Sequence, residues 1–182
     1  RLGGQLLGRR VLVTGAAGGV GRFAVELASR SGAGVTGIAS TPERAAGLRE
    51  LGAGDVLHDI ADAQGTFDLI LESVGGSSLS TAVGLLAPDG VCVVFGNSSG
   101  QPSALGFADF AGCPRARFLP FRVYESGEPP TFGQDLARLV ALVASGRLHP
   151  GIGFLGDWGE PQAAVVALRD RQVRGKAVLE VS

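Results

Sequence analysis

The segment TGAAGGVG at residues 14–21 constrains the fold of this chain more than any other part of the sequence. It follows the run RVLVT at residues 10–14, which is short, β-branched and apolar on both faces, as a parallel strand between two helix layers should be. From residue 19 to residue 31, apolar side chains recur at helical spacing, and Gly32 and Gly34 end the pattern. A strand, a glycine-rich turn and a helix in this order are the context that a dinucleotide-binding turn requires.

The residues of this turn have separate predicted roles. Aligned on the helix, Ala16 takes the first glycine position of the dinucleotide fingerprint and must tolerate the tight turn. Gly18 lets the backbone approach a pyrophosphate, and Gly21 lets the helix pack closely on the strand. The N–H groups of Gly19 and Val20 face the anion at the positive end of the helix. The alternative interpretation is a tight turn that binds no ligand.

Strands and helices alternate along the rest of the chain. Further strands are predicted at residues 35–39, 55–58, 67–72, 91–95, 117–123 and 177–181, and further helices at residues 42–51, 79–86, 132–144 and 161–170. This alternation predicts an α/β Rossmann fold, a doubly wound parallel sheet with helices on both faces. Pro114 and Pro120 place the strand at residues 117–123 at an edge of the sheet, because proline cannot donate to a strand ladder.

Composition excludes several classes of partner. Sixteen basic and seventeen acidic side chains are scattered along the chain, which indicates neither nucleic acid nor an anionic membrane surface. No stretch reaches the roughly 18 to 20 apolar residues of a membrane span, so a cytoplasmic protein is expected. Cys92 and Cys113 lack the paired spacing of disulfides or zinc sites, and His58 and His149 lie far apart. We therefore predict reduced, structural thiols and no metal site.

The end of the second strand indicates the cofactor. An NAD-binding fold places an acid there, about 20 residues after the glycines, to bind the ribose hydroxyls. Here the strand ends with Ile38-Ala39-Ser40, and Arg44 follows one turn into the next helix. Since no carboxylate would repel a 2′-phosphate, the sequence predicts NADP(H), with Ser40 and Arg44 binding that phosphate. Arg44 as an ordinary solvated helix residue is the alternative.

Several motifs, in this order, resemble the medium-chain dehydrogenase/reductase superfamily. They are VLVTGAAGGVGRFAVELA, ERAAGLRELGA, SVGG, FGNSSG and the closing GKAVLEV. Within the superfamily, AAGGVG and FGNSSG resemble the zinc-independent quinone oxidoreductase branch. The resemblance implies an NADPH-dependent oxidoreductase that transfers hydride to a quinone, an enone or a similar conjugated carbonyl substrate. It also implies a homodimer joined through the sheet edge near residues 117–123.

The resemblance also implies which residues bind the cofactor. Carried onto this sequence they are Ala17, Gly18, Gly19, Val20, Ser40, Arg44, Val74, Phe95, Gly96, Asn97 and Arg171. At the end of the third strand, where members of the branch often place a tyrosine against the phosphate end, this chain has Asp59, which we include in the site. No catalytic residue is assigned, because the nicotinamide itself supplies the hydride and the protein positions it.

The same resemblance predicts the domain organisation. Residues 1–149 are expected to form the NADP(H)-binding Rossmann domain, and residues 150–182 to return to an N-terminal catalytic domain that would precede Arg1. The absence of methionine and the start at arginine agree with that expectation. Two alternatives stay open: a non-catalytic nucleotide-binding sensor or structural relative, and the enoyl reductase domain of a larger synthase.

Overall fold

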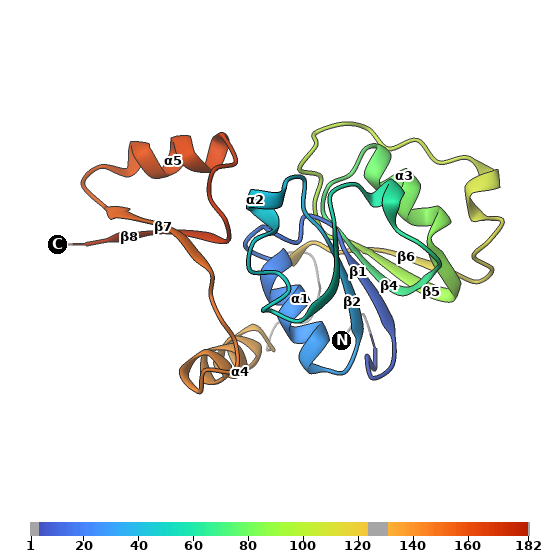
Figure 1. The fold of residues 1–182 in the computed structure, drawn as a ribbon, viewed down its shortest axis with the longest axis horizontal. Coiled ribbons are helices and arrows are strands. Elements are labelled where there is room, and N and C mark those ends of the chain that lie inside the picture. The colour runs from blue at the N-terminus through green and yellow to red at the C-terminus, as the bar shows by residue number, and fades with distance from the viewer. Residues whose placement is uncertain (1–3, 124–130, 182) are drawn as a thin grey trace.

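A six-stranded parallel sheet forms the centre of the computed structural model, which describes residues 4–123 and 131–181 (Figure 1). Its strands lie in the order β3-β2-β1-β4-β5-β6. They are β1 (Arg10–Val13), β2 (Gly34–Ile38), β3 (Ala53–Leu57), β4 (Phe67–Glu72), β5 (Leu86–Val94) and β6 (Arg117–Pro120). The order reverses between β1 and β4, as it does in dinucleotide-binding folds. The predicted doubly wound sheet is confirmed, and β6 lies at its edge as the prolines indicate.

Each face of the sheet carries its own hydrophobic core. Val11 and Val13 of β1 pack with Val25 of α1 (Gly21–Arg30) on one face. Leu12, which points the other way, packs in a second core with Val83 of α3 (Ser77–Gly84). Because strands alternate their side chains, only a strand covered on both faces can bury three successive residues in this manner.

Most predicted elements agree with the structure to within about three residues at each end, and two differ more. The helix expected at residues 42–51 is only α2 (Pro42–Ala45), although Thr41 caps it, its Oγ1 accepting a hydrogen bond from Arg44 N at 3.3 Å. The helix ends because Ala46 has an extended ψ of 132° and Gly47 then adopts the left-handed region with φ 82°. β5 begins five residues before the strand expected at residues 91–95, and its pairing with β4 has an irregular register at that end.

The C-terminal part forms a smaller unit beside the Rossmann sheet (Figure 1). After α4 (Thr131–Ala144), strands β7 (Ile152–Asp157) and β8 (Lys176–Glu180) pair in parallel, and α5 (Pro161–Arg169) connects them. β7 was not predicted from the sequence, because its glycines obscure the alternation of apolar residues. Gly153 is required there, since a side chain would overlap the backbone of Arg174. The return of this unit to another domain stays a prediction.

Two short 3-10 helices, η1 (Ile60–Asp62) and η2 (Phe107–Phe110), complete the described structure. In residues 4–123 and 131–181, no helix is long and apolar enough to cross a membrane. Both cysteines are buried and free. Burial, with a smaller contribution from the nearby Glu72, raises the pKa of Cys92 to about 12, which favours the protonated thiol at neutral pH.

Candidate dinucleotide-binding site

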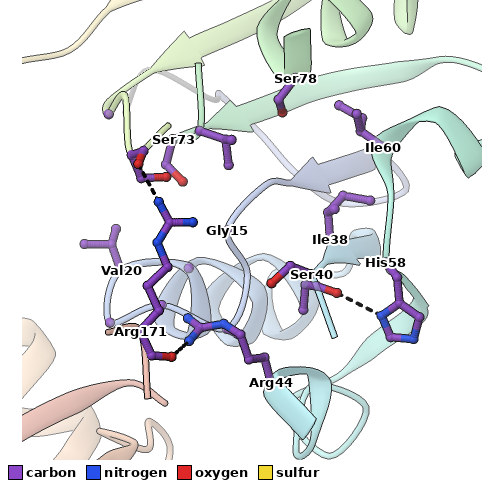
Figure 2. A pocket seen from close by; sticks show the side chains of 18 of the residues that line it. Gly15, Val20, Ile38, Ser40, Arg44, His58, Ile60, Ser73, Ser78 and Arg171 are labelled. Atoms are coloured by element: carbon purple, nitrogen blue, oxygen red, sulfur yellow. Dashed lines mark hydrogen bonds between the residues drawn. The ribbon is translucent and has the colours of Figure 1, made fainter. Parts of the chain in front are cut away.

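A groove of about 680 Å³ opens at the carboxyl ends of the parallel strands (Figure 2). Its volume is in the usual range for small-molecule sites. Eleven of the twelve predicted site residues line it: Ala17, Gly18, Gly19, Val20, Ser40, Arg44, Asp59, Val74, Phe95, Gly96 and Arg171. Asn97, the twelfth, is outside that lining, and its Oδ1 accepts a hydrogen bond from Ser99 Oγ at 3.1 Å. That these residues bind a cofactor stays a prediction.

The glycine turn has the close backbone packing that the sequence predicted. Gly18 N donates to Gly15 O at 2.9 Å, which closes the turn. The left-handed residue is Gly15, with φ 58°, one position before the Ala16 that the fingerprint alignment assigned to the turn. Ala16 is completely buried instead. A Cβ on Gly21 would overlap Gly15 O and lie 2.7 Å from Ala16 Cα, so only glycine lets α1 start this close to β1.

The N-terminus of α1 opens directly into the groove. Its cap residue, Val20, is 57% exposed, makes no side-chain cap hydrogen bond and lines the cavity. The first turn of the helix contains no acidic residue. The helix is ten residues long, so its aligned peptide dipoles place partial positive charge at this end. The backbone therefore presents an anion-binding surface at the centre of the groove.

Two arginines meet at the side of the groove next to β2. Arg44 Nη1 donates to the carbonyl oxygen of Arg171, a contact between residues 127 positions apart. Arg171 adopts φ 57°, and its Nη2 donates to Ser98 O at 2.8 Å, so its side chain crosses the groove (Figure 2). Ser40 is exposed between these cations and the end of β2. The arrangement brings the predicted phosphate-binding residues together.

The end of β3 adds an imidazole and a carboxylate to the same side. Asp59 Oδ1 accepts from Ala61 N at 2.9 Å, which caps η1 and engages this oxygen locally. His58 Nδ1 lies 2.8 Å from Ala39 O, which holds the ring at the end of β2 (Figure 2). His58 lines the groove although it was not among the predicted site residues, because nothing in its local sequence pattern separates a site residue from a turn residue.

A family model described as zinc-binding dehydrogenase matches residues 19–141, more than half of the chain. The chain belongs to this family. Bovine prostaglandin reductase-3 is 33% identical over 162 residues, which are 81% of this chain and 43% of that protein. Erythronolide synthase EryA2 of Saccharopolyspora erythraea is 33% identical over 98% of this chain and 5% of the synthase. The solved quinone oxidoreductase of Coxiella burnetii has 25% identity and a TM-score of 0.72, covering 98% of this chain and 54% of its own.

These comparisons confirm that the chain is a medium-chain dehydrogenase/reductase related to the quinone oxidoreductase branch. It spans about half the length of the solved quinone oxidoreductase, and less of the two curated relatives. Zinc independence stays a prediction. Among residues 4–123 and 131–181, no three His, Cys, Asp or Glu side chains are grouped so that they could hold a metal ion.

The C-terminal unit brings a further cation to the glycine turn. Gly175 N donates to Ala17 O at 3.1 Å, and Gly175 pairs with Gly18 in an isolated bridge. The adjacent Lys176 ammonium is so close to Gly19 that a Cβ there would lie 2.5 Å from Nζ. The sequence analysis missed this role. The signal was available in the closing GKAVLEV motif, which contains the single lysine of the chain.

A buried glutamate anchors the start of the C-terminal unit on helix α1. Glu26 of α1 accepts from His149 N at 2.9 Å, from His149 Nδ1 at 2.7 Å and from Arg30 Nη2 at 3.0 Å. Burial acts to raise the pKa of Glu26, but the hydrogen bonds from His149 and Arg30 outweigh it and lower the pKa. Two residues further on, Gly151 O accepts from Lys176 N at 2.7 Å. The anchor therefore helps to hold Lys176 beside the glycine turn.

Proposed function

We propose that the chain is the NADP(H)-binding part of an oxidoreductase that transfers hydride from NADPH to a quinone, an enone or a similar conjugated carbonyl compound. The observation that carries this proposal is the charge of the groove. The α1 N-terminus and Lys176 meet at the glycine turn, and Ser40, Arg44 and Arg171 line the groove beyond β2. A dinucleotide with an additional phosphate on its adenosine ribose matches that distribution.

The two ends of the groove suit the two halves of such a molecule. In this fold each half of the sheet accommodates one mononucleotide, so the adenosine half is expected over β1 and β2 and the nicotinamide half over β4 and β5. Small polar side chains, Ser73, Ser77 and Ser98, line the second region. They leave room for a flat ring to lie at the strand ends. When bound, NADPH supplies the hydride, and the chain holds and orients it.

We expect the 182-residue chain alone to bind NADPH without reducing quinones or enones at an appreciable rate. The reason is that the chain spans 43% to 54% of the non-synthase relatives described above, so the acceptor site is proposed to need the rest of the enzyme. Binding is measured by calorimetric titration and turnover by loss of NADPH absorbance. Failure to bind NADPH would contradict the proposed function. Robust turnover, with contaminating reductases removed, would contradict the proposed location of the acceptor site.

The enoyl reductase domain of a larger synthase is the second candidate. It is favoured by the alignment of 98% of this chain with a segment that is only 5% of erythronolide synthase EryA2. The two candidates differ in their acceptor, so the intact protein should be assayed with both a quinone and an enoyl thioester. Reduction of the thioester alone would favour the synthase domain, whereas no turnover with either would favour a non-catalytic nucleotide-binding relative.

We expect NADPH to bind better than NADH, with the preference located at the end of β2. Arg44→Ala removes a guanidinium from the proposed 2′-phosphate site. Charge-assisted hydrogen bonds contribute roughly 1.5 to 3 kcal/mol, so NADPH affinity should fall by about tenfold to a hundredfold. NADH affinity should hardly change. Ala39→Asp should shift the preference from NADPH toward NADH, because the new carboxylate repels the 2′-phosphate and accepts hydrogen bonds from the ribose hydroxyls. Calorimetric titration of each variant with both cofactors measures these effects.

Arg49→Ala is the matched control for this prediction. Arg49 follows α2, is absent from the groove lining, and its Nη1 donates to Gly54 O at 2.6 Å. Its loss removes the same charge from the same region, so the affinities for both cofactors should stay close to wild type. Equal weakening of NADPH and NADH by Arg44→Ala would show that Arg44 does not bind the phosphate, and the NADP assignment would then be withdrawn.

We also propose that the intact protein is a homodimer joined through β6. This strand is at the edge of the sheet and leaves one ladder unpaired within the described residues, while Pro120 removes one donor and implies a short contact. Sedimentation of the full-length protein at micromolar concentration should therefore give a dimer. A monomer under those conditions would refute this arrangement.

A further inference from the structure

Glu72 is a buried carboxylate that the proposed function does not use. It is the last residue of β4, its relative exposure is 0%, and it is absent from the groove lining. It accepts hydrogen bonds from Thr14 Oγ1 at 3.1 Å, Val74 N at 3.0 Å, Gly75 N at 3.0 Å and Ser78 Oγ at 3.0 Å. Two of these partners are backbone amides, which can only donate, and the other two are hydroxyls, which are able to donate, so the carboxylate oxygens are well supplied with donors.

These hydrogen bonds fix the turn between β4 and α3. Gly75 and Gly76 adopt φ values of 73° and 57°, so two successive residues are in the left-handed region where glycine is freest. Glu72 holds the amides of Val74 and Gly75 and also reaches Ser78 in the first turn of α3. Two adjacent glycines lose much conformational entropy when a turn becomes ordered. The hydrogen bonds to the Glu72 carboxylate offset part of that cost and favour one conformation of the turn.

The same carboxylate joins this turn to the glycine turn after β1. Thr14 Oγ1 donates to Glu72 and accepts from Ser73 N at 2.9 Å, while Ser73 Oγ donates to Thr14 O at 3.1 Å. The network therefore crosses from β1 to β4, where the strand order reverses and the two nucleotide-binding halves meet. Ser73 and Val74 line the groove, and Figure 2 shows Ser73 at the end of the groove opposite Arg44.

We propose that Glu72 is a positioning residue for the nicotinamide half of the cofactor. It acts through the turn at residues 73–76, whose backbone and side chains it holds against the groove, and it does not touch the cofactor itself. This inference rests on the proposed function. The two ends of the groove then have different roles. The cations beside β2 hold the adenosine phosphate, and the Glu72 hydrogen bonds order the surface under the nicotinamide ring.

The test compares two ligands that cover different parts of the groove. NADPH spans both halves, whereas adenosine 2′,5′-bisphosphate covers only the adenosine side. In Glu72→Gln the amide oxygen can keep the place of Oε1 with its three other donors, while Oε2 becomes an NH₂ group that faces the Gly75 N–H. That N–H loses its 3.0 Å hydrogen bond to Oε2 and keeps only the longer one to Oε1 at 3.3 Å. NADPH affinity should then fall by about tenfold. Affinity for the bisphosphate should stay within twofold of wild type, by calorimetric titration of both ligands.

Glu72→Asp is the conservative variant and should recover part of the NADPH affinity, because it keeps a carboxylate beside the two amides. If Glu72→Gln does not fold, the aspartate variant takes its place, with a smaller loss of NADPH affinity expected at unchanged bisphosphate affinity. Equal losses for the two ligands, or no loss for either, would overturn the positioning role. If wild type bound neither ligand, the proposed function would fail first and this inference with it.

Discussion

Gly18→Val should abolish measurable NADPH binding while leaving the fold intact. Gly18 lines the groove at the point where the glycine turn faces the α1 N-terminus, and its own φ is not in the left-handed region. A Cβ would lie 3.2 Å from Gly15 O, a tight contact that the turn can relieve by a small shift. The two branches of valine would then occupy the space through which a pyrophosphate must pass.

The expected size follows from the contacts that would be lost. A pyrophosphate kept away from the turn cannot reach the N–H groups of Gly19 and Val20. Two charge-assisted hydrogen bonds at roughly 1.5 kcal/mol or more each amount to at least about a hundredfold in affinity. Calorimetric titration with NADPH measures the loss, and circular dichroism with thermal unfolding checks the fold.

Gly84→Val is the control for this substitution. Gly84 ends α3, is exposed, and a Cβ there would meet no atom within 4 Å. The same change in side chain should therefore leave the NADPH affinity at its wild-type value. The assignment of Gly18 to the pyrophosphate would be wrong if the Gly18 variant were folded and bound NADPH within a few-fold of wild type.

The centre of the sheet could be predicted from the sequence because its inner strands, such as β1 and β4, are buried on both faces. The predicted strand at residues 67–72 has the bounds of β4, and burial of Phe67, Leu69 and Ile70 explains why its side chains are mostly apolar. The glycine turn was predictable for a related reason: close backbone packing at Gly21 excludes every side chain. In both cases a contact in the folded protein restricts which residues a short stretch of sequence can contain, so the stretch reveals the contact.

The remaining features depend on contacts that no local pattern contains. The segment ERAAGLRELGA has the composition of a helix, yet the extended ψ of Ala46 and the left-handed Gly47 leave α2 with four residues. The contact between Arg44 and the Arg171 carbonyl joins two elements that are distant in sequence. Lys176 reaches the glycine turn because residues 149–151 are fixed on α1, again a long-range contact. Spacing within one segment carries no information about these arrangements.

Gly21→Ala should reduce the free energy of unfolding by about 2 to 3 kcal/mol, a cost at the upper end for an overpacked core position. The added Cβ would overlap Gly15 O and lie 2.7 Å from Ala16 Cα and 2.9 Å from Ala16 C. All three are backbone atoms of a buried turn, so they cannot move as a flexible side chain does. Helix α1 would have to shift away from β1 and loosen the contacts of Val25.

Thermal and denaturant unfolding measure this loss, and Gly84→Ala is its control. For a domain of this length the expected decrease in Tm is roughly 5 to 10 °C. In Gly84→Ala the same methyl group enters open space on another helix, where alanine is favoured over glycine, so stability should stay equal or rise by up to about 1 kcal/mol. Wild-type stability in Gly21→Ala would contradict the packing role.

The variants of Gly18 and Gly21 should distinguish an effect on NADPH binding from an effect on folding. Gly18 and Gly21 lie three residues apart, yet a side chain at Gly18 enters the groove and a side chain at Gly21 enters the backbone of the preceding turn. We therefore expect Gly18→Val to lose NADPH at nearly wild-type Tm, and Gly21→Ala to lose Tm while its folded fraction still binds NADPH at low temperature. If the glycine turn served only to reverse the chain, neither glycine would face a ligand. Gly18→Val and Gly21→Ala would then change NADPH affinity and Tm in the same way.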